Sequence, residues 1–122
     1  MLTLRHTAER IQKGVDPTIA IKEHCDAWNG SRDPRLFQEE PPLTAMPWID
    51  AWLAGAAEYE AFLIDEPAPA WTLAPERFLK APFCVGGPNA RKYALVETPF
   101  AWRRRLVFSG RTMLRGANQK TD

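Results

Sequence analysis

The chain contains 122 residues, of which 45% are hydrophobic and 25% charged, and it carries a formal net charge of +1. This length fits one domain, and an ordinary apolar fraction with a low net charge argues against a wholly disordered chain. No apolar run approaches the roughly 20 residues that cross a bilayer, and the first residues lack the apolar core of a signal peptide. Two cysteines do not make a disulfide framework, so we expect a soluble cytoplasmic domain with no membrane contact.

Two short helices are predicted at the N-terminus. Thr3 is a suitable cap for a helix that ends near Gly14, and the pair Asp16-Pro17 is a strong start signal for a second helix that ends near residue 30. Each helix is short and amphipathic and needs the other to bury its apolar side. Residues 1–30 are therefore predicted to form a helical hairpin.

Residues 29–44 are rich in turn-forming pairs and are expected to be a loop. The clearest predicted helix follows over residues 46–64, where apolar side chains recur at helical spacing. Asp50 lies in its first turns, where a carboxylate complements the helix dipole. Glu58 and Glu60 are two positions apart, so they point in different directions and are expected on a solvated face.

The remainder, residues 73–117, is predicted to hold short helices and a basic block. Thr72 is expected to cap a short helix that Pro82 ends, and Thr98-Pro99 to restart a helix that continues to Arg105. Residues 118–122 are expected to be a disordered tail. The predicted fold is a mainly α, compact single domain over residues 1–117, with five or six short helices joined by proline-rich connectors.

The sequence contains no residue pattern typical of a catalytic site. His6, His24, Cys25 and Cys84 lack the spacing of a metal site. Neither cysteine has the surroundings of a nucleophile, the glycines before Arg91 form a turn rather than a phosphate loop, and nothing indicates paired carboxylates in a cleft. We expect a protein that is not an enzyme and that has no cofactor and no metal.

Charge is divided unevenly along the chain. Residues 1–90 hold 8 Lys and Arg against 13 Asp and Glu, whereas residues 91–122 hold 8 against 2. Trp102 precedes a run of three arginines, and arginines neutralise phosphates while an aromatic ring stacks on a base. The arginine-rich third could therefore contact nucleic acid, or it could pair with the acidic central helix. The sequence leaves both interpretations open.

Five tryptophans are many for a chain of this size. Trp48 and Trp52 are four positions apart and share a face of the central helix. This face is either a broad core surface or a partly exposed surface that docks a partner, since tryptophan is enriched at binding hot spots.

Three stretches resemble a family of small uncharacterised bacterial proteins. They are WIDAWLAGAAEYEAF (48–62), PAPAWTLAPERFLKAPFCVGG (67–87) and ALVETPFAWRRRLVFSGRTMLRGA (94–117). In that family an acidic, aromatic helix precedes a PAPAWT segment and an arginine-rich block, with Phe where this chain has Trp102. Members look like accessory proteins encoded beside nucleotidyltransferase-like proteins, as in toxin–antitoxin loci. The resemblance implies an antitoxin-like role and brings no catalytic motif.

The resulting hypothesis is a non-enzymatic binding protein that masks a partner protein, such as a nucleotidyltransferase-type toxin. An acidic face that includes Asp50, Glu58, Asp65 and Glu66 would meet a basic cleft of the partner. The alternative is a nucleic-acid-binding accessory protein or autorepressor that uses the arginine-rich third. Oligomeric state is left open. The residues expected to bind the partner are Trp48, Asp50, Trp52, Glu58, Trp71, Trp102, Arg103, Arg104 and Arg105.

Overall fold

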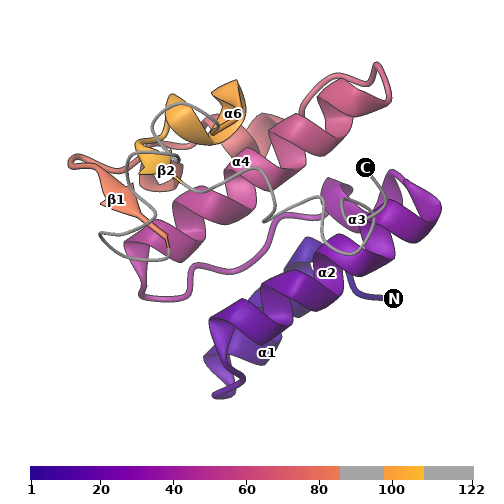
Figure 1. The fold of residues 1–122 in the computed structure, drawn as a ribbon, viewed down its shortest axis with the longest axis horizontal. Helices are drawn as coiled ribbons and strands as arrows, with labels where there is room; N and C mark the ends of the chain where they lie inside the picture. The colour runs from indigo at the N-terminus through magenta and orange to yellow at the C-terminus, as the bar shows by residue number, and fades with distance from the viewer. Residues whose placement is uncertain (86–97, 109–122) are drawn as a thin grey trace.

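The computed structural model describes residues 1–85 and 98–108. These residues form a mainly α fold, as predicted (Figure 1). The elements in chain order are α1 (Leu4–Gln12), α2 (Pro17–Ser31), α3 (Arg35–Gln38), α4 (Pro47–Leu63), the 3-10 turns η1 (Ala70–Leu73) and η2 (Pro75–Arg77), β1 (Phe83–Cys84), α6 (Phe100–Arg103) and β2 (Val107–Phe108).

The N-terminal hairpin is confirmed, and its two caps are those that the sequence indicates. The Thr3 side chain accepts a hydrogen bond from the backbone N–H of His6 at 2.9 Å. Asp16 accepts one from the backbone N–H of Thr18 at 2.8 Å, with Pro17 as the first helical residue. The helices α1 and α2 pack against each other, and each buries its apolar side there.

Helix α4 is the centre of the fold and confirms the predicted central helix. It runs between the α1–α2 hairpin on one side and α6 with the two short strands on the other (Figure 1). Its residues from Ile49 to Ala57 are all buried, so α4 has neighbours around most of its circumference. Alanines and Gly55 make up much of this stretch, and small side chains let the surrounding elements approach closely.

Three local predictions are wrong. The expected loop over residues 29–44 contains α3, whose Leu36 and Phe37 are buried because they pack beneath α4 and against Trp28. Thr72 does not cap a helix, since its hydroxyl donates to the Pro69 carbonyl at 2.7 Å inside η1. Two 3-10 turns replace the short helix predicted there.

The last described residues form a strand that the sequence did not predict. Val107 pairs with Phe83, and Phe108 with Cys84, in a two-stranded parallel sheet. The turn predicted at the glycines before Arg91, residues 109–117 of the predicted basic block and the tail predicted to be disordered over residues 118–122 all lie outside the described residues. Within the described ranges no helix has the length and apolar character needed to cross a membrane.

Candidate interaction surface

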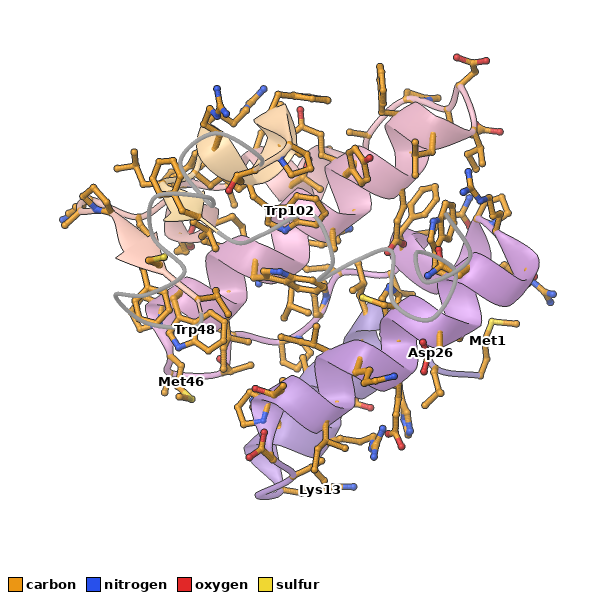
Figure 2. All side chains as sticks on the ribbon, in the orientation of Figure 1. Met1, Lys13, Asp26, Met46, Trp48 and Trp102 are labelled. Atoms are coloured by element: carbon orange, nitrogen blue, oxygen red, sulfur yellow. The ribbon has the colours of Figure 1, made fainter. Side chains whose placement is uncertain are left out.

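Two of the predicted anchors are core residues. Trp52 is fully buried, Trp102 is 3% exposed, and their ring centroids are 5.7 Å apart. The indole N–H of Trp102 donates to the Trp52 carbonyl at 2.9 Å, and the ring lies between α6 and α4 (Figure 2). Gly55 makes this approach possible, because a Cβ there would lie 2.4 Å from the Trp102 ring. Trp52 and Trp102 are therefore unavailable to a partner in this fold.

Asp50 is also buried and has a structural role. Its carboxylate accepts hydrogen bonds from the Thr44 backbone N–H at 2.8 Å and from the Thr44 hydroxyl at 2.9 Å. These bonds fix the path of the chain as it enters α4. Asp50 is therefore not part of an acidic surface, which corrects the sequence-based expectation.

Glu58 pairs with the arginine block inside the fold. It forms ion pairs with Arg104, at 3.2 Å, and with Arg105. Arg105 is fully buried and also donates to the carbonyls of Ala101 and Thr72 at 2.7 and 2.8 Å. Arg104 and Arg105 therefore pair with the central helix inside the fold, which is one of the two interpretations that the sequence left open. Arg103 is exposed at the end of α6.

Glu60 lies on the opposite side of α4 and joins it to α2, so the prediction of a solvated face is wrong for this residue. Its carboxylate is 2.7 Å from Nε2 of His24, and both side chains are fully buried. Nδ1 of His24 lies 2.8 Å from the Leu2 carbonyl and donates to it. One proton shared between His24 and Glu60 satisfies all of these contacts.

The electrostatics of this pair follow from burial. Burial by itself would lower the pKa of His24, but the charge and hydrogen bond of Glu60 outweigh this effect and raise that pKa. Burial raises the pKa of Glu60, although His24 opposes the change. Burial and the neighbouring Glu60 also raise the pKa of the Cys25 thiol, so this thiol stays protonated near neutral pH.

Trp71 is partly exposed but is used within the fold. Its indole N–H donates to the Gln38 carbonyl at 3.3 Å, and the guanidinium carbon of Arg77 lies 5.0 Å from its ring centroid. Arg77 itself is buried and donates to the Pro41 carbonyl. Trp71 therefore holds the connector after α3 against the 3-10 turns.

Trp48 packs against the edge of the core and stays partly exposed at the start of α4. It stacks on Phe83 with a centroid distance of 4.9 Å and an interplanar angle of 17°. Met46 is 41% exposed and Phe83 37%, and Met46 lies beside Trp48 at the start of α4 (Figure 2). We call Met46, Trp48 and Phe83 the Trp48 surface. Met46 and Phe83 were not predicted from the sequence. Only the position of Met46 before Pro47, where the helix begins, could have indicated that residue. No local signal links Phe83 to Trp48.

A second exposed aromatic pair lies near the other end of α4. Phe62 and Phe100 meet edge to face with centroids 5.3 Å apart, and they are 59% and 45% exposed. Neither was among the residues expected to bind a partner. Their contact joins α4 to α6, which are far apart in the sequence, so only the fold reveals it.

No group of three or more His, Cys, Asp or Glu side chains that could hold a metal ion occurs in the part of the chain that the structure describes. Comparison of the chain with models of protein families, with curated proteins and with solved structures finds no match.

Proposed function

We propose that the chain is a non-enzymatic, antitoxin-like binding protein that masks a partner protein, with the Trp48 surface as its anchor. The observation that supports this proposal most is the stacked pair of Trp48 and Phe83, which leaves a partly exposed indole beside an exposed phenylalanine and the exposed Met46. Tryptophan, phenylalanine and methionine are enriched at protein interfaces, and an aromatic stack is rigid before binding.

The four carboxylates predicted to form one acidic face do not lie on one surface. Asp50 and Glu58 are engaged inside the fold, whereas Asp65 and Glu66 are exposed beyond the end of α4. Trp48 and Asp65 are 17 positions apart, which corresponds to about 25 Å along a helix. The Trp48 surface and the acidic tip are therefore separate, and the anchor is apolar rather than acidic. A nucleotidyltransferase-type toxin is the partner that the sequence resemblance implies.

The proposal is tested by tagged purification from the native host at moderate salt, with and without nuclease. We expect a stoichiometric protein that survives nuclease treatment. Trp48→Ala should reduce its recovery at least about tenfold, the loss that removal of an interface hot spot causes. Ile19→Ala is the matched control, since Ile19 is also an exposed apolar residue but lies on α2.

Two outcomes would overturn the proposal. Recovery of nucleic acid alone, lost on nuclease treatment or added salt, would favour the alternative that the arginine-rich third binds nucleic acid. Equal recovery of the partner by wild type and Trp48→Ala would show that the Trp48 surface is not the anchor. Circular dichroism of each variant shows whether the fold is retained.

A further inference from the structure

We propose that a second copy of this chain docks on the exposed ridge formed by Arg104, Phe100, Phe62, Asp65 and Glu66, so that two chains form a two-fold symmetric dimer. This ridge lies at the opposite end of α4 from the Trp48 surface, and the inference does not depend on the proposed function.

The ridge has a fixed order of charge because α6 runs antiparallel to α4. Phe100 meets Phe62 at 5.3 Å between ring centroids, and Arg104, four residues after Phe100, meets Glu58, four residues before Phe62. A cation therefore lies on one side of the aromatic pair. Asp65 and Glu66 lie three and four positions after Phe62, just beyond the end of α4, so two carboxylates lie on the other side. The ridge is basic, then aromatic, then acidic.

The acidic end is electrostatically unfavourable in a single chain. Helix α4 ends with Asp65 in the left-handed conformation (φ 58°), and the Glu66 N–H returns to the Ala61 carbonyl at 2.9 Å, as in a Schellman motif. The end of a helix carries partial negative charge, yet the last turn of α4 has no basic residue. Neither Asp65 nor Glu66 has an ion-pair partner among the described residues. A cation from another molecule would relieve this repulsion.

At the basic end of the ridge, the Arg104 guanidinium has N–H groups that can donate to a second chain. The side chain of Arg104 is 44% exposed. It contacts Glu58 through one nitrogen, Nη1, and its guanidinium carbon lies 5.5 Å from the Phe78 ring centroid. A guanidinium has five N–H donors, so Arg104 can hold Glu58 and a second carboxylate together.

A second copy of the ridge supplies the complementary order. A two-fold axis through the aromatic pair brings the phenylalanines of two chains together and places the Arg104 of each chain opposite the acidic end of the other. Arg104 lies four positions after Phe100, and the carboxylates of Asp65 and Glu66 lie three and four positions after Phe62, so the two kinds of charge lie on opposite sides of the axis. The exposed apolar centre with a charged rim is the usual composition of an interface.

The test is analytical ultracentrifugation of the full chain over a range of concentrations. We expect a monomer–dimer equilibrium whose dissociation constant rises at least about tenfold in Phe62→Ser and in Phe100→Ser. Ile19→Ser is the matched control and should leave it unchanged, because Ile19 is equally exposed on α2. Both phenylalanines are at the surface, so these variants should keep their fold, which circular dichroism verifies.

A charge exchange makes the test specific for the ridge. Glu66→Lys alone and Arg104→Glu alone should each weaken self-association, since each homodimer would oppose like charges. An equimolar mixture of the two variants should dimerise again, because both contacts of the mixed dimer regain opposite charges. A wild-type chain that stays monomeric at every concentration would overturn the inference, as would a dimer that Phe62→Ser does not weaken or a mixture that stays monomeric.

Discussion

Trp48 and Trp52 lie one turn apart on the same side of α4, and they differ in what covers them. Trp52 packs on Trp102 and is fully buried, whereas Trp48 stacks on Phe83 and stays partly exposed beside Met46. Both residues lie on the same face of the helix, so position on the helix does not explain the difference in burial. The difference comes from segments far along the chain: α6 packs on the middle of α4 and brings Trp102 onto Trp52, whereas Phe83 of the short strand β1 stacks on Trp48 in the first turn. One apolar stripe thus serves as core at one place and as surface at another.

Removal of each indole in turn tests whether Trp48 and Trp52 differ in this way. Trp52→Ala should lower the free energy of unfolding by about 3–5 kcal/mol, because it leaves a large cavity beside Trp102. Trp48→Ala should lower it by about 1–2 kcal/mol, because it removes a stack at the surface. Urea unfolding followed by circular dichroism measures both values. Equal losses would mean that Trp48 is a core residue and that the proposed anchor is wrong.

The next largest effect is expected at Gly55, which makes room for the Trp102 ring. Alanine usually stabilises a helix relative to glycine by about 1 kcal/mol. At Gly55 the sign should reverse, with a loss of about 1–3 kcal/mol, because the new methyl group would overlap the Trp102 ring. Gly30→Ala in α2 is the matched control, since a Cβ there meets no atom within 4 Å. A stabilised Gly55→Ala variant would show that Trp102 does not pack against α4 as described.

Helix α4 also carries two glutamates with different kinds of partner: Glu58 pairs with guanidinium groups, and Glu60 pairs with an imidazole. Glu58 pairs with Arg105, a guanidinium that stays protonated at all accessible pH values. Glu58→Gln should therefore lower the free energy of unfolding by about 1–3 kcal/mol, and this loss should be the same at every pH between about 6 and 8. Thermal or urea unfolding at several pH values measures this offset. An offset that disappears within this range would contradict a fixed-charge pair.

Glu60 should behave differently, because its partner His24 carries an imidazole, which can lose its proton. The folded state raises the pKa values of both groups above their ordinary values of 4.5 and 6.5, so it binds protons more tightly than the unfolded chain. The stability that the pair contributes is therefore complete at low pH. It decreases as pH rises above 4.5 and again above 6.5, because the unfolded chain then releases a proton that the folded pair still holds.

Glu60→Gln should reverse the pH slope around neutrality. Without the carboxylate, burial lowers the pKa of His24, and the neutral ring accepts a hydrogen bond from the new amide. The variant should then lose stability as pH falls below 6.5, whereas the wild type loses it as pH rises above 6.5. Unfolding midpoints measured across this range distinguish the two slopes. An unchanged slope would show that the His24–Glu60 pair does not control it.

The features predicted correctly from the sequence are local ones. The caps at Thr3 and Asp16 act on residues two or three positions away, and the long apolar pattern of α4 identifies that helix by itself. The fold class followed from these elements. The prediction failed for α3, because its four residues are too few for a periodic pattern.

The candidate surface was predictable only in part, because exposure depends on distant neighbours. Glu58 and Glu60 were expected on a solvated face, but their partners Arg105 and His24 are 47 and 36 positions away. Periodicity placed Trp48 and Trp52 on one face correctly, yet it could not tell which one Trp102 covers. Phe62 and Phe100 carry no sequence signal of pairing, since neither position has a local reason to face the other.

The central claim is that Trp48 is the surface anchor for a partner while Trp52 belongs to the core. The most direct measurement is hydrogen exchange of the five indole N–H groups by NMR, assigned with single Trp→Phe variants, before and after addition of the purified partner. We predict fast exchange at Trp48, slow exchange at Trp52 and Trp102, and slowing on partner binding at Trp48 alone among these three. A Trp48 indole that exchanges as slowly as that of Trp52, or that is unaffected by the partner, would contradict the claim.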